Sequence, residues 1–180
     1  MLAIALVFLT ALLAAFQPTS SARPHPADQW SIIPTSPRPW NSNHTLEYYV
    51  HVLVGDVDVG TLISPIDSKL TNSFGSTQLF AFNVTEGVDP LSTHLGFVRG
   101  YNVQASYDST PVGVEVENVS YDDGSFKGTI QLQGLIGTGT NEIAVVGGTG
   151  DFRGARGYGI VTQVSSVGNA VLYRHELHFL

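Results

Sequence analysis

The chain contains no cysteine, which excludes disulfide bonds, thiolate zinc sites and cysteine nucleophiles. Charged residues make up only 13% of its 180 residues, about half the share of an average soluble domain. Fifteen acidic residues against eight basic ones argue against a nucleic-acid-binding face. One methionine and 19 glycines do not suit a coiled coil or a long helical bundle. After these exclusions, we expect one globular domain with a hydrophobic core.

The common catalytic motifs are also missing. The six histidines are scattered, and His175 and His178 are three apart on an expected strand, so they point to opposite faces. That spacing does not favour a metal site. The glycine-rich stretch that starts at Gly147 does not fit G-x-G-x-x-G from Gly148, because Arg153 takes the sixth position. We therefore expect neither a metal nor another cofactor.

The first residues read as a targeting segment. Residues 2–16 are almost all apolar, and Ser20 and Ala22 are spaced like a signal-peptidase site, so we expect a signal peptide over 1–22. An N-terminal membrane anchor is the alternative. The chain also has three N-glycosylation sequons, which together with a signal peptide indicate a secreted, extracellular glycoprotein; they begin at Asn43, Asn83 and Asn118.

Residues 23–45 form a proline-rich arm in our interpretation. Five prolines in this range disfavour helix interiors and sheet ladders. Trp30 and Trp40, the only tryptophans, lie here and either dock on the domain or face a partner.

From residue 46 to 180 the pattern is that of β-strands. Residues 46–54 are rich in aromatic and β-branched side chains. In 112–119 the residues alternate, which places Val112, Val114 and Val116 on one face and Glu115 and Glu117 on the other. The step Asp123-Gly124 then predicts a hairpin to a strand over 126–132.

Short segments with turn residues between them predict the remaining strands, over 59–63, 77–84, 95–106, 142–146, 157–165 and 170–179. Consecutive strands without helical crossovers pair antiparallel. A barrel removes the free edges of such a sheet. We therefore predict an all-β fold, an eight-stranded antiparallel β-barrel, with a β-sandwich as the alternative.

The most distinctive segment runs from Gly147 to Tyr158. By itself it reads as a glycine-rich turn between two strands. It also resembles the signature of the plant dirigent family, Gly-Gly-Thr-Gly-x-Phe-x-x-Ala-Arg-Gly-Tyr, and every fixed position is present. Other segments resemble the family in the same order, at 48–51, 80–89, 96–100, 123–129 and 172–177. The resemblance covers residues 46–180.

The resemblance implies an eight-stranded, allene-oxide-cyclase-like barrel that is secreted to the apoplast and forms homo-oligomers, either trimers or dimers. Such proteins steer the coupling of two phenoxy radicals, for example from coniferyl alcohol on the way to lignans. A separate laccase or peroxidase makes the radicals. Some members instead cyclise or dehydrate quinone-methide-like intermediates by acid–base chemistry. The implied partners are small phenolics and the oxidase, without nucleic acid or membrane.

Two residues are the candidates for chemistry. Asp151 stands at the variable position of Gly-Thr-Gly-x-Phe, and an acid of raised pKa in an apolar barrel can protonate an intermediate. A solvated turn residue is the alternative. Arg156 can hold a phenolate or pair with Asp151, or form a structural salt bridge. The candidates for substrate binding are Tyr49, His51, Tyr101 and Tyr107, although tyrosines are often simply packed in the core.

The chain departs from the family pattern at two places. Val52 follows His51 where the family commonly has aspartate, and Phe97 and Arg99 replace arginine and glutamine. A second hypothesis is therefore a secreted, non-catalytic barrel that binds carbohydrate or cell-wall polymers in defence. A third, a metal oxidase, would need copper, iron or manganese.

Overall fold

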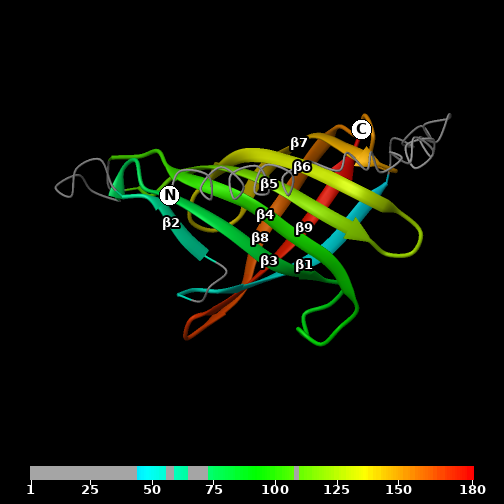
Figure 1. Ribbon diagram of the computed structural model, residues 1–180, viewed down its shortest axis with the longest axis horizontal. Helices are drawn as coiled ribbons and strands as arrows, with labels where there is room; N and C mark the ends of the chain where they lie inside the picture. Colours follow the sequence, from blue (N-terminus) through cyan, green and yellow to red (C-terminus); the bar gives the residue numbers. More distant parts are fainter. Residues whose placement is uncertain (1–43, 56–58, 65–72, 108–109) are drawn as a thin grey trace, which may run out of the picture. The chain divides into compact units, whose positions relative to one another are not determined.

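The computed structural model describes residues 44–55, 59–64, 73–107 and 110–180 (Figure 1). The described residues form strands joined by turns, without an α-helix, and so without a helix able to cross a membrane. The expected signal peptide, most of the proline-rich arm, Asn43 and both tryptophans lie outside these residues. The strands are β1 (Thr45–Leu53), β2 (Val59–Ile63), β3 (Thr77–Thr85), β4 (His94–Gln104), β5 (Gly113–Asp122), β6 (Lys127–Ile136), β7 (Asn141–Gly150), β8 (Gly157–Val167) and β9 (Ala170–Phe179).

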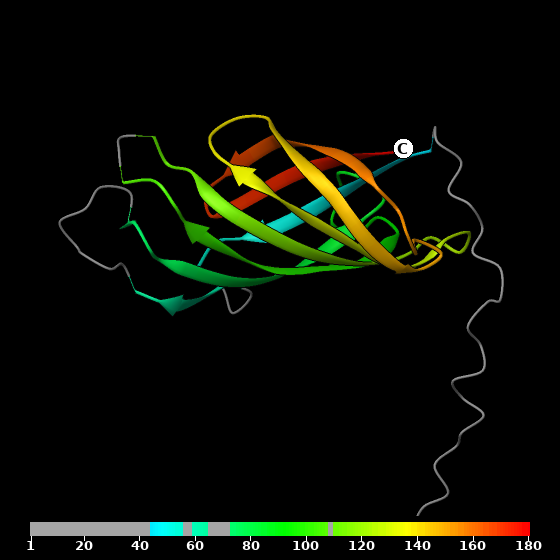
Figure 2. The same cartoon turned by 90° about the horizontal axis from the view of Figure 1, so that it is seen from above.

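Eight of these strands close into an antiparallel barrel, which confirms the predicted fold. The strand order is β1-β9-β8-β7-β6-β5-β4-β3, and β1 also pairs with β3 to complete the ring. Figure 2 shows the strands running obliquely around the barrel, as closure requires. The short strand β2 is the ninth. It pairs with the first half of β3, from Thr77 to Phe80, while β1 pairs with the second half, from Asn83 to Thr85.

The hairpin between β5 and β6 is present where the Asp-Gly step predicts it. Gly124 has a φ of 83°, which suits glycine. The Asp123 carboxylate accepts hydrogen bonds from the N–H groups of Ser125 and Phe126 at 2.8 and 2.7 Å. These hydrogen bonds to a side chain take the place of backbone ladder hydrogen bonds within the turn.

The glycine-rich segment differs from the expected turn. Gly147–Gly150 continue strand β7, and the turn itself is Asp151–Gly154. Close packing explains the glycines, because a Cβ on Gly148 would stand 2.6 Å from both Phe152 and the Thr129 carbonyl oxygen. Gly150 also has a φ of 62°. The glycines therefore let the turn fold back and place Phe152 inside the barrel.

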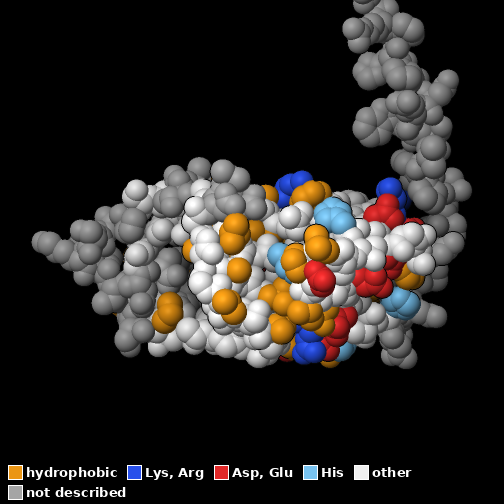
Figure 3. Space-filling view, turned by 90° about the horizontal axis from the view of Figure 1, so that it is seen from below, with side chains coloured by type: hydrophobic (Ala, Val, Ile, Leu, Met, Phe, Trp, Pro, Cys, Tyr) orange, Lys and Arg blue, Asp and Glu red, His pale blue; other side chains and the backbone are white. Residues whose placement is uncertain are grey.

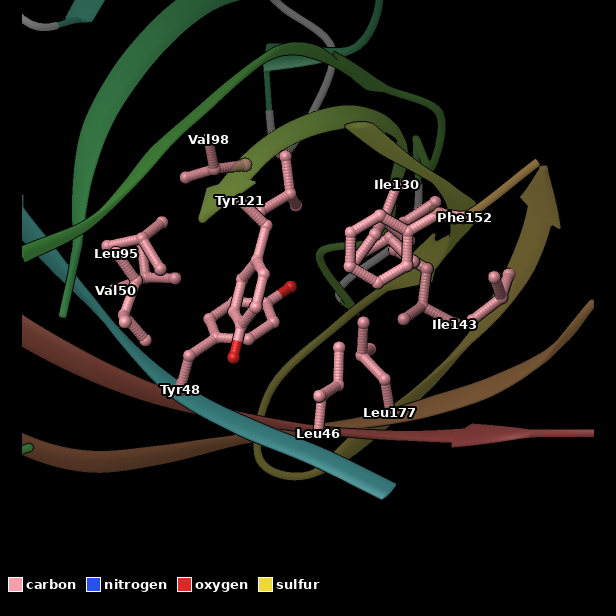
Figure 4. Packing of buried hydrophobic residues seen from close by; sticks show 14 of the residues in the cluster. Leu46, Tyr48, Val50, Leu95, Val98, Tyr121, Ile130, Ile143, Phe152 and Leu177 are labelled. Carbon is pink, nitrogen blue, oxygen red and sulfur yellow. The ribbon is translucent and has the colours of Figure 1, made fainter. Parts of the chain in front are cut away.

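The interior has a filled half, which contains the turn between β7 and β8. There the Phe152 ring is fully buried and packs edge-on against Tyr121, with centroids 5.7 Å apart. Phe126 and Phe179 lie beside Phe152. Figure 4 shows Tyr48 and Tyr121 side by side in the interior, with Phe152 next to Ile130. The other half contains the candidate site.

Candidate functional site

The barrel encloses a cavity of about 350 Å³ in its less filled half. This volume lies within the range of about 300–1,000 Å³ that small-molecule sites occupy. The lining is mainly apolar and aromatic, with five other polar side chains. It consists of Val50, Val52, Val54, Val59, Phe80, Phe82, Val98, Ile136, Val161 and Tyr173, then Gln78, Asn102, Glu115, Glu117 and His175. Such a lining suits a flat, mostly apolar guest that carries a few oxygen atoms.

Strand β5 points its two glutamates into this cavity. Glu115 and Glu117 share the inner face with Val119 and Tyr121, while Val114 and Val116 lie on the outer face. The sequence predicted the two faces of this strand but not which of them is inside. The signal lies at Asn118, where the apolar positions change from even to odd numbers and Val119 and Tyr121 continue the face of the glutamates.

Glu117 meets residues of the opposite side of the barrel. It lies on β5 and is 4% exposed, and its Oε2 is 3.8 Å from Nδ1 of His175 on β9. That separation is too long for a hydrogen bond. Nδ1 of His175 lies 3.2 Å from the Tyr48 hydroxyl on β1, which is directly paired with His175 in the ladder. Oε2 of Glu117 has no hydrogen-bond donor among the described residues.

Burial determines which protonation states of Glu117, His175 and Tyr48 are favoured. It raises the pKa of Glu117 well above its usual value, and the charge of Glu115 and a hydrogen bond with Glu115 add to this effect. Burial lowers the pKa of His175 to about 3 and raises the pKa of Tyr48. The neutral forms of all three side chains are favoured. The Tyr48 hydroxyl and Nδ1 of a neutral His175 share one hydrogen bond, whose donor is set by the tautomer of His175. The protonated form of Glu117 is favoured over the carboxylate.

Glu115 is oriented by the neighbouring strand. The Asn102 amide on β4 donates from Nδ2 to Oε2 of Glu115 at 2.9 Å, and the two residues are directly opposite in the ladder. Glu115 is therefore held as a hydrogen-bond acceptor on the inner face, two residues from Glu117.

Tyr49 and His51 share a face of β1, as alternation predicts, but it is the outer face. Their neighbours Tyr48, Val50 and Val52 point inward. The Tyr49 hydroxyl donates to Glu47 at 3.0 Å, and Nε2 of His51 lies 2.8 Å from Oγ1 of Thr85. Neither of the two side chains lines the cavity.

Asp151 and Arg156 lie at the turn that closes the filled half. Oδ2 of Asp151 accepts a hydrogen bond from the Lys127 N–H at 2.9 Å, and the Arg156 guanidinium donates to the carbonyl oxygens of Val146 and Ala155. Neither side chain lines the cavity, and Arg156 is exposed. The structure thus places both at hydrogen bonds that hold the turn, and their catalytic roles stay predictions.

The two other tyrosines that we predicted to bind substrate, Tyr101 and Tyr107, lie on the outside of the barrel. Tyr101 is exposed beside a shallow groove with Leu79 and Arg99, and the ring of Tyr107 contacts Phe74 edge-on at 5.9 Å. Figure 3 shows hydrophobic side chains gathered on one face of the surface, with acidic and basic ones beside them.

The sequons at Asn83 and Asn118 have exposed asparagines on the outer faces of β3 and β5. Within the described residues, no three His, Asp or Glu side chains converge as a metal site would require.

Comparisons with known proteins agree with this architecture. A family model described as Dirigent-like protein matches residues 43–179. Dirigent protein 11 of Arabidopsis thaliana is 35% identical over 123 residues, a match that spans 64% of this chain and 62% of that protein. Dirigent protein 1 of the same plant is 29% identical over 136 residues, which is 73% of this chain and 74% of that protein.

Solved structures share the fold. The pterocarpan synthase dirigent proteins GePTS1 and PsPTS1 both superpose with a TM-score of 0.65, at 24% and 23% identity. Each match covers 74% of this chain, and 82% and 92% of the respective neighbours. The family match, which spans most of the chain and the whole barrel, shows that this protein belongs to the dirigent family.

Proposed function

We propose that this protein binds a flat, phenol-derived guest in the barrel cavity and directs the stereochemistry of its conversion. The conversion is either the coupling of phenoxy radicals or the cyclisation of a quinone methide in phenylpropanoid metabolism. The observation that carries the proposal is the cavity itself, a mainly apolar hollow with a few groups in its wall that can bind the oxygen atoms of a guest. Such a lining fixes both the plane of an aromatic guest and the direction of its oxygen atoms.

Small energy differences are enough for this function. A preference of about 1.4 kcal/mol between two orientations of a guest gives tenfold selectivity. One hydrogen bond to a polar side chain of the cavity wall contributes about that much. The oxidation that makes radicals or quinone methides is assigned to a separate laccase or peroxidase, which works beside this protein in the extracellular space.

The cavity favours quinone-methide cyclisation over radical coupling. Its volume of about 350 Å³ lies at the lower end of the range for ligand sites, which suits one guest better than two. Radical coupling also has no use for a proton donor, whereas a quinone methide gains electrophilicity when its carbonyl oxygen is protonated. A buried glutamate on β5 that lines the cavity supports that second reaction.

The experiment uses the purified, full-length secreted protein in two assays. In the first, laccase oxidises coniferyl alcohol and related phenols with and without the protein. In the second, a preformed quinone methide with a pendant hydroxyl group cyclises without any oxidase. We expect one enantiomer in excess in the second assay, measured by chiral chromatography. Racemic products in both assays across the panel would contradict the proposal, and binding of wall polymers without any effect on products would favour a binding module.

A further inference from the structure

Two glutamates on β5, Glu115 and Glu117, line the cavity, and Glu117 is the more deeply buried of the two. Oε2 of Glu117 is buried, has no donor among the described residues and belongs to a side chain that lines the cavity. Buried polar atoms are almost always hydrogen-bonded, so an unpaired one beside an open volume indicates a ligand that completes it. An oxygen atom of the guest is a suitable partner for a protonated carboxyl group.

We propose that Glu117 is the catalytic acid of this barrel and that Glu115 is the base that works with it. This assignment rests on the proposed function. Glu117 stands next to the guest volume, and Glu115 lies two residues along the same inner face, so the two carboxyl groups reach one guest from one side. Asn102 fixes Glu115 through a 2.9 Å hydrogen bond and makes it a positioned acceptor.

The surroundings favour the protonated form of Glu117. The other titratable side chains that face it are His175 and Tyr173 from β9 and Tyr48 from β1, while Gln78 and Asn102 are neutral amides. Burial lowers the pKa of His175 and raises those of both tyrosines, so none of the three takes the proton of Glu117 near neutral pH. No lysine or arginine is among the described residues that line the cavity.

The step is balanced without an oxidant. Glu117 gives its proton to the carbonyl oxygen of the quinone methide, and this oxygen becomes a phenol hydroxyl. The pendant hydroxyl oxygen attacks the methide carbon and forms the new C–O bond, while its O–H bond breaks and the proton goes to Glu115. Transfer of that proton from Glu115 to Glu117 restores the starting state. The product is an isomer of the guest, with no net change in protons or electrons.

The test compares Glu117→Gln and Glu115→Gln with Glu142→Gln, a matched change at an exposed glutamate on β7. The probe is the preformed quinone methide with a pendant hydroxyl. We expect Glu117→Gln to lower the cyclisation rate by roughly 10²- to 10⁴-fold, the usual contribution of a positioned acid. Binding of the corresponding stable phenol should change only a few-fold. Glu117→Asp should restore part of the rate, and Glu142→Gln should behave as wild type.

A second readout does not depend on activity. Infrared difference spectra of the wild-type protein near neutral pH should contain the band of a protonated carboxyl group, and Glu117→Gln should abolish it. The absence of this band in the wild type, or its persistence in the variant, would overturn the proposal. A wild-type rate and pH profile in Glu117→Gln would overturn the role of Glu117 but not the proposed function. A wild-type protein that neither accelerates nor steers the cyclisation would overturn both.

Discussion

Oε2 of Glu117 and Nδ1 of His175 lie 3.8 Å apart in the interior of the barrel, yet the two residues are not an ion pair. Both side chains are more than nine-tenths buried, and burial disfavours the charged form of each. A buried carboxylate beside an imidazolium would need hydrogen bonds to offset the loss of water. Here Tyr48 already occupies Nδ1 of His175, so two neutral groups face one another.

Neutral His175 makes the fold sensitive to acid. Its folded pKa of about 3 lies below the unfolded value of 6.5, so the unfolded chain binds the proton more tightly. This contribution to stability is complete above the unfolded pKa and is lost as the pH falls from 6.5 towards 3, at up to about 1.4 kcal/mol per pH unit. We expect His175→Gln to flatten the fall in urea-denaturation free energy over that window. His94→Gln, at an exposed position, should keep the wild-type slope, and equal slopes in both variants would contradict the assignment.

Glu117 gives the opposite pH dependence. Its folded pKa is raised above the unfolded value of 4.5, so the folded chain binds the proton more tightly. Stability is therefore highest below 4.5 and falls as the pH rises from there through the folded pKa. We expect Glu117→Gln to gain stability relative to wild type at neutral pH and little near pH 4, in urea titrations at both values. A constant difference at the two pH values would show that the proton is not involved.

Filling the cavity should separate binding from folding. Val161 is buried and lines the cavity, so Val161→Phe places a ring in the guest volume. We expect guest affinity to fall at least tenfold, about 1.4 kcal/mol, while stability changes by no more than about 1–3 kcal/mol. Val164→Phe on the same strand is exposed and serves as the control. Calorimetric titration with the stable phenol measures the guest affinity of both variants. Unchanged affinity in Val161→Phe would place the guest elsewhere.

The glycine-rich signature around Phe152 should act mainly on the fold. The Phe152 ring is fully buried, and Phe152→Ala should cost about 3–5 kcal/mol in free energy of unfolding. Phe97→Ala, at a ring 37% exposed that stacks with Arg99, should cost about 1 kcal/mol or less. Thermal and urea unfolding measure the free energy of unfolding of both variants. Similar losses in the two variants would mean that the filled half does not depend on this ring.

The barrel and its strands could be predicted from the sequence because alternation and turn residues are local signals. The location of the acid could not. Residue alternation separates Glu115 and Glu117 from the valines beside them, yet Val114 and Val116 make the outer face of that segment look like the buried one. The meeting of Glu117 with His175 joins strands that are not neighbours, and no short-range pattern encodes it. The same limit applies to Tyr49 and His51, which alternation groups correctly but cannot orient.

The closure of the ring has a consequence for its dynamics. Strand β1 pairs with β9 along its whole length, from Thr45 to Leu53, but with β3 only from Tyr49 to His51. Because the β1–β3 ladder is so short, few hydrogen bonds hold it together. We expect thermal fluctuations to open it before the other strand pairs of the barrel. Deuterium uptake by the amides of Asn83 and Thr85 should then be faster than uptake in the β8–β9 hairpin. The barrel is expected to open along one line, between β1 and β3, while its other strand pairs stay hydrogen-bonded.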